Sequence, residues 1–253
     1  MAANYWESSQ FQRFLLTRYE LAEAEAMHAA QMTRQELRIG KRLRARQEIN
    51  AAAHVYFKRF YINNTFYDID PYLMAATCVF LACKSGECPQ HTKYVLSEAK
   101  AVFAEVSQDI RFPYDAADIA ECESYLLEEM KFYLVLHHPY QALIDINQQA
   151  GLQKASLQAA WSIINDSYRT DMALVYPPHV IAVAALFLSR VVDQGGQPDA
   201  EAQQWYADLN VDITDVLQVV GELLAVYEVW KGYTEDKMPN TVSRYIADIA
   251  ATA

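Results

Sequence analysis

Few residues in this chain of 253 residues have the types and spacing that a catalytic or metal-binding site requires. The four cysteines stand at positions 78, 83, 88 and 122, and no two of them form a C-x-x-C pair. The adjacent His137 and His138 have no cysteine or carboxylate at ligand spacing. We therefore predict reduced, buried thiols and no metal or other cofactor.

Motifs of known enzymes are missing as well. The chain contains no G-x-x-x-x-G-K-[ST] or G-x-G-x-x-G phosphate loop, no H-E-x-x-H and no G-x-S-x-G. The adjacent acids Glu128 and Glu129 would point in different directions on a helix, so they cannot act together as an acid and a base. We favour a binding protein without catalytic activity. A helical enzyme without a familiar motif is the alternative.

The charge of the chain bears on its partners. The net charge is −11, and an acidic protein repels the phosphate backbone of nucleic acids. A local exception is a basic cluster, which consists of Arg34, Arg38, Lys41, Arg42, Arg44 and Arg46. We favour a solvated helix face here, with a nucleic-acid patch and a patch for an acidic protein partner as the alternatives.

The elements that must position any site are helices. Glycine and proline are scarce, at 7 and 8 residues, which disfavours folds rich in turns. Apolar residues at 119, 122, 126, 130 and 133 form one stripe of an α-helix. The first residues lack the pattern of a signal peptide, and no apolar run reaches the length of about 20 residues that crosses a bilayer. We expect an all-α, soluble, intracellular protein.

Two segments, 73–83 and 180–188, are apolar on every side and must be surrounded by other helices. Asp70 and Pro71 mark the start of the first segment, and Pro178 marks the start of the second. At an offset of 107, residues 51–83 and 158–190 share seven identities. This duplication predicts two tandem five-helix bundles.

The predicted boundaries follow from these signals. The first bundle occupies 33–138 and the second 139–233, because the residue before Pro139 is pushed out of helical geometry. An N-terminal extension over 1–32 contains an amphipathic helix at 11–21. A tail over 234–253 contains a short helix at 241–250.

Several local motifs are specific when they are taken together. One set comprises Arg46-Gln47, AHVYFKRFY at 53–61, DIDPYLM at 68–74 and TCVFLACK at 77–84. A second set comprises ANYW at 3–6, YLLE at 125–128, HHPY at 137–140, NDSYRTD at 165–171 and YPP at 176–178. The first set resembles the cyclin box of transcriptional members of the cyclin family, and the second resembles the cyclin C type within that family.

The resemblance implies a fold, a partner and a location. The two bundles would be cyclin boxes, and the chain would be a regulatory subunit without catalytic activity. It would bind and activate the cyclin-dependent kinase of the Mediator kinase module, together with two further Mediator subunits. It would act in the nucleus, in transcription by RNA polymerase II. The alternative is a cyclin-fold transcription adaptor that does not activate a kinase.

The resemblance also implies site residues. In cyclins a lysine at the end of the third helix and a glutamate on the fifth bind backbone groups beside the αC helix of the kinase, and Lys84 and Glu123 match them. The remaining candidates for kinase binding are Tyr56, Lys58, Arg59, Tyr61, Phe11 and Phe14. The candidates for a groove that binds another Mediator subunit are Trp6, Asn165, Asp166 and Tyr168.

One departure from the family pattern lies next to Lys84. Most cyclins of this kind have an apolar residue and two acids after the lysine, whereas this chain has Ser85-Gly86-Glu87. Gly86 is expected to end the helix early. Without the family, Lys84 would be interpreted as a cation at the end of a helix and Glu123 as a solvated acid.

Overall fold

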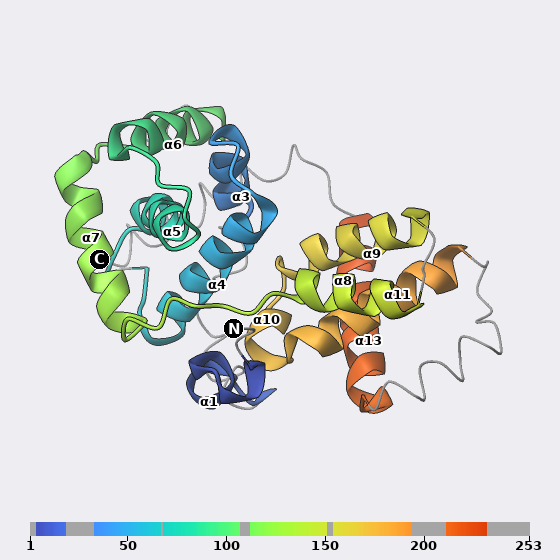
Figure 1. Cartoon of the computed structure of the whole chain (residues 1–253). Helices are drawn as coiled ribbons and strands as arrows, with labels where there is room; N and C mark the ends of the chain where they lie inside the picture. The colour runs from blue at the N-terminus through green and yellow to red at the C-terminus, as the bar shows by residue number, and fades with distance from the viewer. Residues whose placement is uncertain are drawn as a thin grey trace.

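The structure is a computed structural model that describes residues 4–18, 33–66, 68–106, 112–150, 154–193 and 211–231. Every regular element in these ranges is a helix, as predicted (Figure 1). None of the described helices is long and apolar enough to cross a membrane. The helix predicted at 241–250 lies outside the described residues.

The first bundle surrounds one central helix, α5. Figure 1 views α5 nearly end-on, with the other four helices around it. Its residues from Met74 to Cys83 are all buried, which agrees with the predicted apolar segment. The helices of this bundle are α3 (Thr33–Arg42), α4 (Gln47–Asn63), α5 (Pro71–Ser85), α6 (Thr92–Val106) and α7 (Ala116–Glu129).

Both ends of α5 follow from local chemistry. Asp70 is the N-cap, and its carboxylate accepts a hydrogen bond of 2.7 Å from the backbone N–H of Tyr72, while Pro71 occupies the first helical position. At the other end Gly86 is the C-cap. A Cβ atom there would lie 2.8 Å from Cγ1 of Ile49, so only glycine fits this contact between α5 and α4.

The second bundle also has an apolar central helix, α11, which packs against α8, α9 and α13. It starts at Pro178, as predicted, and its residues from Val180 to Leu186 are buried. The described helices of this bundle are α8 (Pro139–Ala150), α9 (Lys154–Ser167), α10 (Met172–Val175), α11 (Pro178–Asp193) and α13 (Ile213–Lys231).

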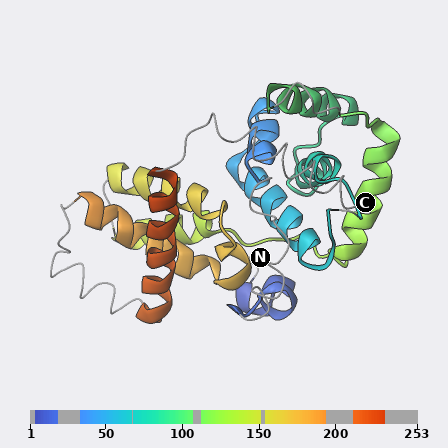
Figure 2. The same cartoon turned by 180° about the vertical axis from the view of Figure 1, so that it is seen from behind.

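The two bundles lie side by side (Figure 2), and side chains from both form one buried cluster. Ala51 and Val55 of α4 pack in one cluster with Ala182 and Ala185 of α11. Helix α8 begins at Pro139. We keep 33–138 and 139–233 as a proposed division into cyclin boxes.

The N-terminal segment differs from its prediction. The helix expected over 11–21 is wrong at residues 15–17, because the structure has the short helices η1 (Tyr5–Glu7) and α1 (Ser9–Phe14), and Leu15 is extended. The end of the predicted helix, 19–21, lies outside the described residues. Ser8 caps α1 by accepting a hydrogen bond of 3.3 Å from the N–H of Phe11. The chain leaves the helix because the N–H of Leu16 donates to the carbonyl of Leu174 in α10, at 2.8 Å.

Candidate functional site

Helices α5 and α7 bring Lys84 and Glu123 together, although 39 residues separate them in the sequence. Nζ of Lys84 lies 2.6 Å from Oε1 of Glu123 and 5.1 Å from the centre of the Phe80 ring. The side chain of Lys84 is 47% exposed and that of Glu123 is 13% exposed. The pair therefore forms a charged site at the surface, with a donor and an acceptor that a partner's backbone can share.

The local folding of α7 explains where Glu123 points. Asp115 and Asp118 form a capping box that starts the helix. The stripe of Ile119, Cys122 and Leu126 is buried against the core, as the spacing predicts. Glu123 follows Cys122 by one position, so it lies at the border of this stripe and reaches the end of α5.

A segment that the sequence analysis missed lies beyond the end of α7. Phe132 is 72% exposed and Val135 is 70% exposed. Lys131 and Phe132 have φ angles of 50° and 60°, a left-handed conformation that is costly for a bulky residue and is often found at functional sites. The predicted stripe continued to position 133, but α7 ends at Glu129 with Met130 as its C-cap. No glycine follows, so residues with side chains must make the left-handed turn.

Two of the predicted contact residues on α4 are buried cations. Lys58 is 2% exposed, and its Nζ lies 2.9 Å from Oδ1 of Asp171 in the second bundle. Arg59 is 3% exposed, and its guanidinium lies 4.2 Å from the centre of the Phe14 ring. Burial lowers the pKa of Arg59 to about 10. We therefore withdraw the prediction that Lys58 and Arg59 contact a kinase, because side chains that are only 2% and 3% exposed cannot touch a partner in this conformation.

The two predicted tyrosines of α4 are buried too. Tyr56 is fully buried, and its hydroxyl donates to the carbonyl of Leu134 at 2.6 Å. Tyr61 is 2% exposed, and its hydroxyl donates to the carbonyl of Ile69 at 2.8 Å. We also withdraw the prediction that Tyr56 and Tyr61 contact a kinase directly. Helix α4 lies between α5 and the second bundle, so little of its surface is exposed.

The aromatic residues of α1 divide between two places. The ring centre of Phe14 lies 6.4 Å from that of Tyr133, so Phe14 adjoins the exposed segment after α7. Phe11 instead stacks edge-on with Trp6, at 4.8 Å. Trp6 is 50% exposed and also contacts His179 at the start of α11, at 5.3 Å.

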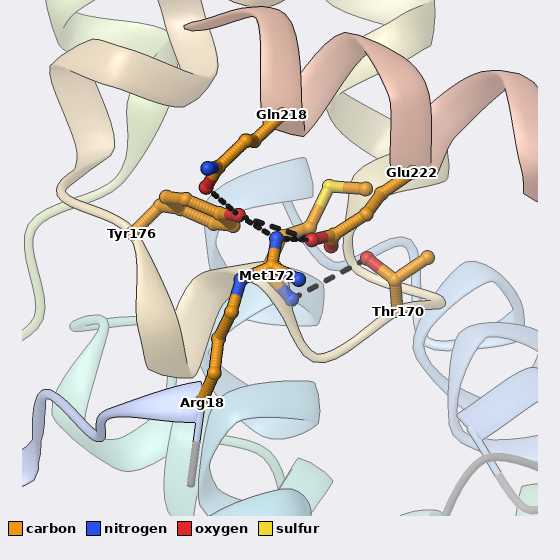
Figure 3. Close-up of polar contacts among 6 residues, drawn as sticks. All are labelled: Arg18, Thr170, Met172, Tyr176, Gln218 and Glu222. Atoms are coloured by element: carbon orange, nitrogen blue, oxygen red, sulfur yellow. Dashed lines mark hydrogen bonds and ion pairs between the residues drawn. The ribbon is translucent and has the colours of Figure 1, made fainter. Parts of the chain in front are cut away.

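The N-terminal segment is held at the junction of the bundles. The side-chain amide of Gln10 donates to the carbonyl of His137 at 3.2 Å, and its oxygen accepts from the N–H of His137 at 2.6 Å. Figure 3 shows Arg18 beside Tyr176 and Glu222 of the second bundle. This segment therefore contacts the linker between the bundles as well as the second bundle itself.

The four residues predicted to form a second groove make their contacts with different elements of the chain. Tyr168 is 3% exposed, and its hydroxyl lies 2.7 Å from Nδ1 of His138, so we withdraw it as a contact residue. Asn165 accepts a hydrogen bond of 2.8 Å from Tyr140 of α8.

Asp166 faces a different helix, because it accepts a hydrogen bond of 3.2 Å from Tyr227 of α13. Burial raises the pKa of Asp166. Asn165 and Asp166 are half-buried. The ring contacts of Trp6 are made elsewhere, with η1, α1 and His179.

The basic cluster proves to be partly structural. Arg38 pairs with Glu105 at 2.7 Å, and Arg42 pairs with both Glu105 and Glu98, so these cations join α3 to α6. Arg46 donates to the carbonyl of Gly86 at 2.7 Å. The side chain of Arg34 lies outside the described residues.

The described residues contain no group of three or more His, Cys, Asp or Glu side chains placed to hold a metal ion. All four cysteines are free; Cys88 is half-buried and the other three are buried. Burial raises the pKa of Cys83 and of Cys122 to about 11. The thiols of Cys83 and Cys122 therefore stay protonated near neutral pH.

Comparison with known proteins decides the family. The model of the cyclin N-terminal domain matches residues 20–135. Cyclin-C of Rattus norvegicus is 37% identical, over 96% of this chain and 89% of its own length. The chain belongs to the cyclin family. Another relative of this cyclin, the RNA polymerase II holoenzyme cyclin-like subunit of Emericella nidulans, is 34% identical over 97% of this chain and 98% of its own length.

Solved structures share the fold of this cyclin. A chain of the yeast RNA polymerase II CTD kinase complex CTDK-1 superposes with a TM-score of 0.70 at 17% identity, over 85% of this cyclin and 73% of that chain. A chain of the CAK complex from Chaetomium thermophilum, bound to ATP-gamma-S, gives a TM-score of 0.66 at 23% identity. At these identities the similarity concerns the fold alone.

Proposed function

We propose that this cyclin binds and activates the cyclin-dependent kinase of the Mediator kinase module, and so regulates transcription by RNA polymerase II. The names of its relatives support this role: they are Cyclin-C and RNA polymerase II holoenzyme cyclin-like subunits. The chain is the regulatory, non-catalytic member of the pair, and it acts in the nucleus.

The surface that carries the proposal is formed by the ion pair of Lys84 with Glu123, by the exposed Phe132 and Val135, and by Phe14, whose ring adjoins Tyr133 of the same segment. We call it the docking surface. The charged pair offers hydrogen bonds to the exposed backbone groups at the end of a helix. The apolar residues offer contacts to the side of the same helix.

A rigid docking surface can activate a kinase without taking part in its chemistry. A protein kinase is active when a glutamate of its αC helix pairs with the lysine of strand three. A partner that binds the inward position of αC more tightly than the outward position shifts the kinase toward the active state. The buried central helix α5 supports this role, because Lys84 lies in its last turn and the helix fixes the base of that side chain.

The single observation that carries the proposal is the partly exposed ion pair at the end of α5. The test is to express this cyclin with the cyclin-dependent kinase of the same organism, purify the complex, and measure phosphorylation of a peptide from the polymerase C-terminal repeat. We expect co-purification and activity that neither chain shows alone. A cyclin that binds the kinase without raising its activity would favour the adaptor hypothesis.

We further propose that Trp6, Asn165 and Asp166 contact another Mediator subunit. Trp6 is half-exposed at the N-terminal segment, and the two polar residues lie at the end of α9. The contacts to Tyr140 and Tyr227 hold their side chains in place. Because these positions lie apart from Lys84, the substitutions Trp6→Ala and Asp166→Ala should weaken binding of that subunit and leave binding of the kinase intact.

A further inference from the structure

The phenol of Tyr56 lies between the two parts of the docking surface. One part is the end of α5, which carries Lys84, and the other is the segment 131–136, which carries Phe132 and Val135. The hydroxyl of Tyr56 lies 3.1 Å from Oγ of Ser85 and donates to the carbonyl of Leu134 at 2.6 Å. One buried oxygen atom thus joins the residue after Lys84 to a residue between Phe132 and Val135.

The segment 131–136 needs such a fixed point. Backbone hydrogen bonds at the end of α7 hold its first residues, with the N–H of Phe132 donating to Leu127 at 3.0 Å and that of Tyr133 donating to Met130 at 2.9 Å. Lys131 and Phe132 adopt left-handed conformations, which persist only when their surroundings impose them. The bond from Tyr56 holds the chain directly after this turn.

We propose that Tyr56 is a positioning residue, whose hydroxyl locks the Lys84 turn and the segment 131–136 into one rigid docking surface. Direct contact with a partner is excluded in this conformation, because the side chain is fully buried. Tyr56 acts through Ser85 and Leu134. The inference rests on the proposed function of the surface, but the lock itself is a property of the free chain.

The substitution Tyr56→Phe tests the lock, because it removes one oxygen atom and keeps the volume of the ring. Tyr61→Phe is a matched control on the same helix, since Tyr61 is also buried and its hydroxyl also donates to a backbone carbonyl, that of Ile69. Ile69 precedes the start of α5, whereas Lys84 lies at its other end, about 20 Å away for a helix of this length. A purely structural role predicts the same behaviour of both variants.

Hydrogen exchange of the free chain gives the first measurement. In Tyr56→Phe, amides in peptides covering 84–88 and 131–136 should exchange about fivefold faster, which corresponds to the loss of one hydrogen bond. In Tyr61→Phe these two peptides should exchange as in the wild type, while the unfolding midpoint falls by a similar amount in both variants. Equal exchange of both peptides in the two variants would overturn the proposal.

Kinase binding gives the second measurement. Tyr56→Phe should weaken the affinity for the kinase about fivefold, and Tyr61→Phe should leave it within error. Wild-type affinity of Tyr56→Phe would refute the positioning role. A wild-type chain that binds no kinase would refute the proposed function instead, and the exchange measurement then decides the lock by itself.

Discussion

Replacing Lys84 by methionine separates the role of this residue in folding from its role in docking. Methionine keeps an unbranched apolar stem above the Phe80 ring and removes the charge that pairs with Glu123. Because Lys84 is 47% exposed, the pair resembles a surface salt bridge, and its loss should lower the free energy of unfolding by only about 0.2–1 kcal/mol. The variant is therefore expected to fold.

The expected effect on docking is larger. A hydrogen bond to a charged group contributes about 1.5–3 kcal/mol when it is buried in an interface. Loss of one such bond should weaken the affinity for the kinase by about 10- to 150-fold. Urea unfolding of the free chain measures the first quantity, and calorimetric titration with the kinase measures the second.

Lys231→Met is the matched control for this prediction. Lys231 lies on α13 and pairs with Glu228 at 2.6 Å, but both side chains are far more exposed. This variant should change neither stability nor affinity beyond error. The exchanged pair Lys84→Glu with Glu123→Lys should restore the stability of the free chain but not kinase binding. The reasoning is refuted if Lys84→Met binds the kinase as tightly as Lys231→Met does.

Two further predictions concern the folded chain itself. The free energy of unfolding should decrease as the pH falls from 7 to 5, because burial lowers the pKa of His54 to about 3 and that of His138 to about 4. The same rings in the unfolded chain take up protons below about pH 6.5, so each should cost about 2 kcal/mol at pH 5. Urea unfolding of His138→Gln, which should lose about 2 kcal/mol of this pH dependence, is the check. Gly86→Ala should lower the free energy of unfolding by about 1–3 kcal/mol, because the added Cβ would lie 2.8 Å from Cγ1 of Ile49. An unchanged midpoint of urea unfolding would contradict this packing.

Much of the fold could be predicted because its signals are local. The capping residue Asp70, the following Pro71 and the continuous apolar run after them define α5 without knowledge of any other helix. The same holds for α11 after Pro178. The predicted helix at 11–21 failed because a long-range hydrogen bond, from Leu16 to Leu174, competes with the helix.

The site could be predicted only in part. Lys84 and Glu123 were named through the resemblance to cyclins, and the structure places them in contact. Phe132 was missed, because the stripe was predicted to continue to position 133, whereas α7 ends at Glu129. Tyr168 was placed on a surface because its motif gave its identity and not its burial.

The sequence by itself determined where α5 and α11 begin and that these two helices must be central. It could not determine what covers α4, because periodicity describes the faces of one helix and not the elements that pack on them. The charged residues Lys58 and Arg59 suggest an exposed face. Lys58 instead donates a hydrogen bond to the carbonyl of Thr170, which lies 112 residues further along the chain. The guanidinium of Arg59 lies against the ring of Phe14 of α1. Only tertiary packing brings these distant groups together, and it thereby decides which side chains are left for a partner.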